Sequence, residues 1–342
     1  MKALFIGGTG TISMAITRLI ADDPGWELYL INRGKRKADL PEGVRLIEGD
    51  INNEEDMKKK LGDLTFDTVC DFIAFVPGHL ERDRRLFEGR TRQYMCISSA
   101  SAYQKPLGDP LITESTPLYN PYWEYSRNKI AMEDLLMRWY REDGFPITII
   151  RPSHTYDERS IPVGVHGDRG SWQVVKRIME KRPVIIHGDG TSLWTVTHNS
   201  DFAKGFVGLM GNPRAIGEAF HITSDESLTW DGIHRRIADA LGVPLRAFHV
   251  SSYFLSAIGP YDFRGSLIGD KANSVIFDNA KLKRTVPGFK CTVRFDQGVR
   301  MALEYIMSHP ECRQEDPDFD RWSDNVIHAL SSAASALKGT KA

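Results

Sequence analysis

Along the first half of the chain, short apolar runs alternate with segments in which apolar side chains recur every three or four positions. The short runs, bounded by glycine or polar residues, are typical of buried strands, and the helical spacing between them predicts helices. Strands that alternate with helices predict a doubly wound parallel sheet with helices on both faces. The expected strands are 2–6, 27–31, 44–47, 68–74, 93–98 and 147–150, and the expected helices begin at Ile12, Glu54 and Tyr125.

The pattern loosens after about Arg151. Further strands are expected at 184–186 and 220–223, with a helix at 199–210 between them. Residues 225–284 are mixed and rich in aromatic side chains, which suits a smaller lobe that closes over a site. The small, polar segment 329–342 is expected to be frayed.

A glycine-rich turn follows the first expected strand. Gly7-Gly8-Thr9-Gly10 leads into a helix, which is the context that a dinucleotide-binding turn requires. Gly7 permits the tight turn, Gly10 lets the backbone approach a pyrophosphate, and the helix N-terminus offers free N–H groups to the phosphates. The third glycine of the pattern is replaced by Ser13, which is small enough for close helix–strand packing. An ordinary strand–helix turn is the alternative, but the position in an α/β chain favours a nucleotide site.

The turn and the alternating pattern together predict an α/β fold: a doubly wound parallel Rossmann sheet with a smaller, discontinuous substrate-binding lobe. We assign 1–155 and 185–222 to the dinucleotide-binding Rossmann domain. Residues 156–184 and 223–328 are assigned to the substrate-binding lobe and C-terminal segment. The cleft between the two is the expected substrate site.

The end of the second expected strand bears on the choice of nucleotide. A carboxylate there binds the adenosine ribose hydroxyls and favours NAD, but this chain has Asn32 and Arg33 followed by Arg36. Because arginine can hold a 2′-phosphate in charge-assisted hydrogen bonds, we expect NAD(P), leaning to NADP. A solvated basic turn is the alternative. Asp50 and Ile51, after the third strand, are expected to flank the adenine.

Tyr125 and Lys129 are four residues apart on an expected helix, so both lie on one face, about 5–6 Å apart at Cβ. A nearby ammonium and a positively charged nicotinamide favour the phenolate and lower the pKa of a tyrosine. The pair can then take a proton from a hydroxyl, or give one to a carbonyl, during hydride transfer. Two surface helix residues would be the alternative if the glycine turn did not precede them.

Ser98 to Tyr103 follow the fifth expected strand. Ligands of such sheets bind beyond the carboxyl ends of the strands, where a serine can hydrogen-bond the reacting oxygen. A capped polar loop is the alternative interpretation.

At this point the chain resembles the extended short-chain dehydrogenase/reductases of the NAD-dependent epimerase/dehydratase family. The resemblance covers roughly residues 1–210 in the family's order, and the ending from Phe277 through Val299 is similar too. The matching residues are Gly7-Gly8-Thr9-Gly10, Asp50-Ile51, Ser98 through Tyr103, Tyr125 with Lys129, Arg151-Pro152 with Tyr156, and Gly188-Asp189-Gly190.

The resemblance implies roles for individual residues. Ser99, Tyr125 and Lys129 fall on the family's catalytic triad, and Ser153 on a residue that lines the nicotinamide pocket. The expected substrate contacts are Ser101, Tyr103, His154 and Trp194. The expected cofactor-binding residues are Gly7, Gly10, Thr11, Ile12, Asn32, Arg33, Arg36, Asp50, Ile51, Phe72, Ala74, Tyr125, Lys129 and Ser153.

Three departures from the family pattern narrow the expectation. Trp194 stands where sugar-nucleotide enzymes carry an arginine that grips the diphosphate, so a smaller polyol, free sugar, sugar phosphate or other carbonyl compound becomes more plausible. Trp194 could equally be a core residue of an altered lobe. Ala100-Ser101 replace the Asp-Glu pair used for dehydration, which disfavours that reaction. Asp71 is unexpected beside a pyrophosphate, so we expect it to point away.

Charge and composition exclude several classes of partner. Lys plus Arg number 44 and Asp plus Glu 45, so a net charge of −1 gives no global reason to expect nucleic acid or an anionic membrane. No apolar run suits a signal peptide or a membrane span, which makes the cytoplasm the expected location.

The four cysteines suggest buried free thiols, and the histidine spacing suggests no metal site. A homodimer is expected only by analogy with the family.

The first functional hypothesis is therefore an NAD(P)-dependent oxidoreductase or epimerase acting on a secondary alcohol or ketone of a sugar-like or polyol substrate. The alternative is an RNA-binding or regulatory protein on the same scaffold, since chloroplast stem-loop RNA-binding proteins are atypical relatives of the family. A basic face could come from the lysines at 58–60 together with Arg33, Lys35, Arg36 and Lys37. The intact Tyr125 and Lys129 favour the enzyme.

Overall fold

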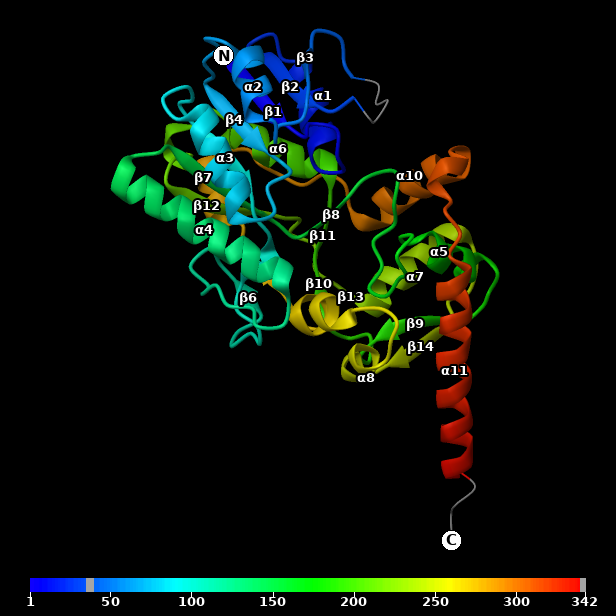
Figure 1. Cartoon of the computed structure of the whole chain (residues 1–342). Helices are drawn as coiled ribbons and strands as arrows, with labels where there is room; N and C mark the ends of the chain where they lie inside the picture. Colours follow the sequence, from blue (N-terminus) through cyan, green and yellow to red (C-terminus); the bar gives the residue numbers. More distant parts are fainter. Residues whose placement is uncertain (35–39, 339–342) are drawn as a thin grey trace. The chain divides into compact units, whose positions relative to one another are not determined.

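The central element of the computed structural model, which describes residues 1–34 and 40–338, is a seven-stranded sheet (Figure 1). Its strand order is β12-β7-β5-β4-β1-β2-β3, and every pair of neighbours is parallel. The predicted doubly wound parallel sheet is therefore confirmed.

The chain divides into two compact units. The first comprises Met1–Thr155, Thr197–Asp225 and Phe277–Thr292, and the second comprises the remaining described segments. The elements of the first unit are β1 (Lys2–Ile6), α1 (Ser13–Ala21), β2 (Glu27–Asn32), β3 (Arg45–Glu48), α2 (Glu54–Leu61), β4 (Thr68–Asp71), α3 (Pro77–Phe87), β5 (Tyr94–Ile97), η1 (Ala100–Ala102), β6 (Leu111–Ile112), α4 (Glu124–Asp143), β7 (Ile147–Pro152), α6 (Asn199–Leu209), η2 (Pro213–Ala215), β12 (Glu218–Ile222) and α9 (Ala280–Thr285).

The second unit is built mainly from helices and short strands. Three short strands, β8 (His154–Tyr156), β11 (Val196–His198) and β15 (Ile276–Phe277), lie where the chain passes from one unit to the other. The elements of the second unit are α5 (Trp172–Met179), β9 (Val184–His187), β10 (Leu193–Trp194), β13 (Leu228–Thr229), α7 (Trp230–Leu241), β14 (Ala247–Val250), α8 (Ser252–Ala257), η3 (Arg264–Lys271), α10 (Phe295–Ser308), η4 (Pro310–Cys312) and α11 (Pro317–Lys338).

The boundaries of the units differ from the predicted ones at three places, one of which is the short segment 223–225, which belongs to the first unit. Residues 185–196 belong to the second unit, because β9 pairs with β14 and not with the central sheet. Residues 277–292 belong to the first unit, where Leu282 of α9 is packed in the core. The segment 329–338, expected to be frayed, continues helix α11, and 339–342 lie outside the described residues.

The two faces of the sheet are covered by different helices (Figure 1). Successive side chains of a strand point to opposite faces, so Leu4 packs with α2, α3 and α4 while Phe5 packs with α1 and α6. Helix α4 ends at Gly144, which adopts the left-handed conformation at φ 70°. Its buried positions include Lys129, Glu133 and Leu136, so this helix carries charged groups into the sheet.

Candidate cofactor and catalytic site

The glycine-rich turn between β1 and α1 is held by the side chain of Ser13. Its Oγ donates to the carbonyl of Gly7 and accepts from the N–H of Gly10, both at 2.8 Å. Gly7 has φ +83°, and a Cβ there would stand 2.4 Å from Cγ2 of Ile73. Ser13, which replaces the third glycine of the pattern, therefore fixes the conformation of the turn through these hydrogen bonds.

This turn lines a cavity of about 410 Å³ next to the ends of β1, β2 and β3. Six of the predicted cofactor residues line it, namely Gly7, Gly10, Asn32, Arg33, Asp50 and Ile51. Asn52, Phe75 and His79 also line it, although no sequence argument singled them out. The ends of parallel strands and a glycine turn are where a dinucleotide binds in such sheets, so these residues fit NAD(P).

At the end of β2 the backbone turns around Asn32. Its Oδ1 accepts from the N–H of Gly34 at 3.1 Å, and its Nδ2 contacts Oγ1 of Thr9 at 3.3 Å. Glu48 is the register partner of Asn32 on β3, and its Oε1 lies 2.9 Å from where a Cβ on Gly34 would stand. A carboxylate from the neighbouring strand is thus brought to this turn. Arg36 lies outside the described residues.

Tyr125 and Lys129 occupy one face of α4. The Lys129 Nζ lies 5.6 Å from the centre of the Tyr125 ring and 5.0 Å from that of Phe75, which lines the cavity. The ammonium donates to the carbonyls of Ala74 and Ile97 at 2.6 and 2.7 Å. Burial lowers the pKa of Lys129. The lysine is therefore anchored where β4 and β5 end.

The serines after β5 form a hydrogen-bonded row. Oγ of Ser99 accepts from the N–H of Ser101 at 3.1 Å and contacts the Ser101 Oγ at 2.9 Å. Ser126, next to Tyr125 on α4, donates to the Ser101 Oγ at 2.7 Å. Ser101 is buried, and Ser99 is only partly so. The predicted catalytic serine is thus linked to helix α4 through Ser101.

A buried ion pair continues the same face of α4. Arg151 of β7 binds the Glu133 carboxylate, with its Nη2 2.5 Å from Oε2, and donates to the Tyr103 hydroxyl at 3.2 Å. Ser98 donates to Glu133. Tyr103 is fully buried and also contacts Nδ1 of His221 at 3.0 Å. Tyr103, expected to contact substrate, is therefore part of a buried network in this unit.

The carboxylate of Asp71 has hydrogen-bond donors outside the glycine turn. It is fully buried, and its carboxylate accepts from Arg82 at 3.2 Å and from the N–H of Ile73 at 2.6 Å. Arg82 also binds Asp83, whose other oxygen accepts from Tyr94 at 2.6 Å. Burial and the Asp71 charge raise the pKa of Asp83 well above its usual range.

The remaining predicted residues lie in several settings. Phe72 packs edge-on against Phe5 at 5.3 Å, in the core beneath α6. Trp194 is 3% exposed in the second unit and stacks on Trp230 at 5.6 Å, so it is a core residue of that unit. The other predicted residues are Thr11 and Ile12 at the start of α1, Ala74 after β4, Ser153 after β7, and His154 in β8.

Two of the residues that the sequence reasoning missed had usable signals. Glu133 lies four residues after Lys129, so the spacing that pairs Tyr125 with Lys129 also places Glu133 on that face. His79 follows Pro77 at the start of α3, and proline at a first helical position marks a helix N-terminus. No comparable signal marks Phe75, which is exposed and unremarkable in sequence.

The sequence model of the NAD dependent epimerase/dehydratase family matches residues 3–223, well over half of the chain. The chain therefore belongs to the NAD dependent epimerase/dehydratase family. The predictions of this family, and of an NAD(P)-dependent enzyme whose reaction subtype is left open, are confirmed.

Two curated proteins and one solved structure illustrate the range of similarity. The chain is 24% identical to 2'-dehydrokanamycin reductase of Streptomyces kanamyceticus, over 73% of this chain and 69% of the relative. It is 25% identical to the chloroplast stem-loop binding protein of 41 kDa b of Arabidopsis thaliana, over 71% of this chain and 64% of the relative.

The solved structure is that of dTDP-glucose 4,6-dehydratase from Bacillus anthracis str. Ames in complex with NAD. It aligns at a TM-score of 0.71 and 17% identity, over 91% of this chain and 98% of that one. At this identity the likeness shows the shared fold. Among the helices of residues 1–34 and 40–338, none combines the length and apolar character that crossing a bilayer requires.

Proposed function

We propose that this chain transfers hydride between NAD(P) and a secondary alcohol or ketone of a sugar-like or polyol substrate, as an oxidoreductase or epimerase. The observation that carries the proposal is the anchored Lys129 ammonium beside Tyr125 and beside the wall of the predicted cofactor cavity. NAD or NADP, when bound, supplies the hydride acceptor or donor.

Tyr125 takes the proton from the substrate hydroxyl in oxidation and returns it to the carbonyl in reduction. Lys129 favours the phenolate, because an ammonium close to a phenol stabilises its anion. Two of the lysine's three donors are fixed on Ala74 and Ile97, which leaves one for a ligand. Ser99 holds the reacting oxygen, and the hydrogen bond to Ser101 orients its hydroxyl.

The glycine turn, Asp50 and Ile51 hold the cofactor, and Arg33 supports a lean toward NADP. Glu48 opposes that lean, because a carboxylate at this turn favours a ribose hydroxyl over a phosphate. A sugar-like substrate is supported by the names of the relatives, which include a 2'-dehydrokanamycin reductase and dTDP-glucose 4,6-dehydratases. Trp194 is buried and cannot bind a diphosphate, which supports a substrate that lacks a diphosphate.

The test is a panel assay with the full chain. NAD⁺ or NADP⁺ is combined with polyols, free sugars and nucleotide sugars, and reduced nicotinamide or epimerised product is measured. Lys129→Met should lose at least about 100-fold in turnover on any substrate found, the range for loss of an acid–base group. Lys129→Met turnover equal to wild type would reject the assignment.

RNA binding remains the second candidate because of the chloroplast stem-loop binding relative. The lysines of α2 argue against a basic face, since Lys58 pairs with Glu55 and Lys60 with Asp56. A titration with single-stranded and stem-loop RNA at low and moderate salt decides between the two. RNA binding that weakens steeply with salt would support this candidate.

A further inference from the structure

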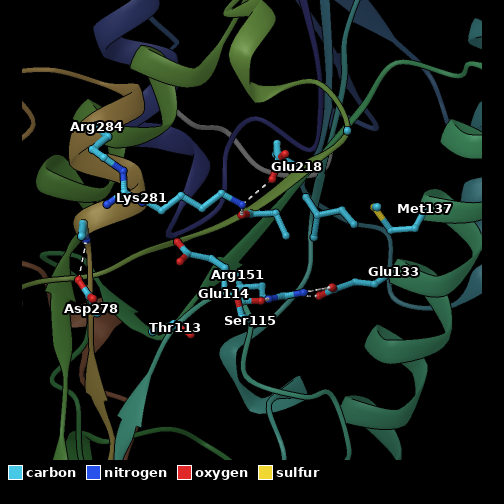
Figure 2. A pocket seen from close by; sticks show the side chains of 14 residues that line it. Thr113, Glu114, Ser115, Glu133, Met137, Arg151, Glu218, Asp278, Lys281 and Arg284 are labelled. Atoms are coloured by element: carbon cyan, nitrogen blue, oxygen red, sulfur yellow. Dashed lines mark hydrogen bonds and ion pairs between the residues drawn. The ribbon is translucent and has the colours of Figure 1, made fainter.

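A second cavity, of about 620 Å³, lies in the first unit and shares no lining residue with the predicted cofactor cavity. Figure 2 shows its walls, which come from residues 113–115, the later half of α4, strands β7 and β12, and helix α9. Its volume is in the range of cavities that bind small molecules.

Most charges on these walls are already paired. Arg151 binds Glu133 through three hydrogen bonds, and Lys281 binds Glu218 at 2.6 Å (Figure 2). Lys281 also donates to the carbonyl of Ala219 at 2.8 Å. Arg151 and Lys281 are therefore committed to acceptors other than the Glu114 carboxylate.

Arg284, which is exposed, and Glu114 are the exceptions, and of the two only the Glu114 side chain is buried. Its side chain is 8% exposed, and its Oε1 has no hydrogen-bond partner within residues 1–34 and 40–338. Nε2 of His221 lies 3.7 Å from that oxygen, which is beyond hydrogen-bonding distance, and contacts the carbonyl of Asp278 at 2.8 Å instead. Burial lowers the pKa of His221, so the ring is neutral at pH 7 and brings no charge to Glu114.

A buried carboxylate oxygen without a donor is costly unless a cation or a hydrogen-bond donor reaches it. We propose that this cavity binds a small organic ammonium ion, with the Glu114 carboxylate as the acceptor of its charge. Within the described ranges no group of three acidic, histidine or cysteine side chains could hold a metal ion, which favours an organic cation. This site does not depend on the proposed function.

The test is calorimetric titration of the full chain in phosphate buffer, which contains no amine. The probes are n-butylammonium chloride and, as the uncharged match, 1-butanol. Butylammonium should bind saturably, with a dissociation constant in the millimolar range or below (about 1 mM is a usual value for so small a ligand). Butanol should bind at least about tenfold more weakly, since charge-assisted hydrogen bonds are the stronger ones.

Glu114→Gln keeps the size of the side chain and removes its charge, and it should weaken butylammonium binding at least about tenfold. Glu55→Gln, on the exposed face of α2, makes the same change in net charge and should leave binding unchanged. Should Glu114→Gln fail to fold, Glu114→Asp withdraws the carboxylate by one methylene and should weaken binding in the same direction. Equal binding of amine and alcohol, no saturable binding, or undiminished binding by the Glu114 variants would overturn the site.

Discussion

Lys129 and Tyr125 are one helical turn apart on α4, and the lysine Nζ lies 5.6 Å from the centre of the tyrosine ring. The ammonium is held there by two backbone carbonyls, and among residues 1–34 and 40–338 no carboxylate forms an ion pair with it. An ammonium this close to a phenol stabilises the phenolate. The first prediction follows from this relationship.

Replacing Tyr125 by Phe should remove the proton-transfer group and keep the ring that packs 5.0 Å from Trp123. Turnover should fall by roughly 10²- to 10⁴-fold, while the dissociation constant of the nicotinamide cofactor changes less than about threefold. Steady-state rates and calorimetric titration of the same preparations measure the two effects. Full activity in Tyr125→Phe would exclude this tyrosine as the acid–base group.

Cofactor choice should respond in opposite directions to the two charged residues near Asn32. Arg33→Ala should weaken NADPH binding at least about fivefold and leave NADH binding nearly unchanged, because only NADPH carries the 2′-phosphate. Glu48→Gln should strengthen NADPH binding relative to NADH, because it removes a negative charge from the same turn. Competitive titration with the two nucleotides gives both ratios. If the ratio of NADPH to NADH affinity is unchanged in both variants, this turn does not contact the adenosine ribose.

Ser13 should stabilise the glycine turn measurably. Ser13→Ala removes the hydrogen bonds to Gly7 and Gly10 and should lower the free energy of unfolding by about 1–2 kcal/mol. Binding of the nicotinamide cofactor should weaken as well, because the turn loses its fixed shape. Ser13→Gly, which restores the family's glycine, should show the same two losses. Denaturant unfolding with and without NADPH is the measurement. If both variants keep the stability and the NADPH affinity of the wild type, Ser13 does not stabilise the turn.

His187 should make the protein less stable in mild acid. Burial lowers its pKa to about 4, whereas an unfolded histidine titrates near 6.5. As the pH falls from 6.5 to 4, His187 is protonated in the unfolded chain but stays neutral in the folded chain. The free energy of unfolding therefore decreases. At about 1.4 kcal/mol per pH unit the loss is about 3 kcal/mol by pH 4.

The control for this prediction is His187→Gln, whose amide can still donate to the carbonyl of Lys271 that Nε2 of His187 contacts at 3.1 Å. Its stability should fall less between pH 7 and pH 4 than that of the wild type. Denaturant unfolding at several pH values gives the difference directly. Parallel curves would show that His187 does not titrate in this way.

The elements with clear periodicity were predictable from the sequence, and α3 was not. Except for the exposed edge strand β3, the strands of the sheet are largely buried and read as apolar runs, and α4 has regular spacing and a glycine stop. The buried face of α3 carries Arg82 and Asp83, which hide the apolar period of that helix. These buried charges are stabilised by hydrogen bonds to Asp71 and Tyr94. Partners that lie far away in the sequence leave no local pattern.

The candidate site was predictable where residues act through local spacing. The glycine turn and the Tyr125–Lys129 pair belong to this kind. Tyr103 and Trp194 could not be placed, since their burial depends on His221 and Trp230, far away in the chain. Strand β9 was assigned to the wrong unit for the same reason: an apolar run does not reveal which strand it pairs with.

The central claim is that the cavity beside the glycine turn binds a nicotinamide nucleotide. Calorimetric titration of the full chain, denatured and refolded or dialysed free of any retained nucleotide, with NADH and with NADPH tests it most directly. The account predicts one-to-one saturable binding of at least one of the two, weakened at least about tenfold by Gly10→Asp, whose carboxylate would repel the phosphates. If the folded protein binds neither nucleotide, the cavity beside the glycine turn is not a nicotinamide-nucleotide site.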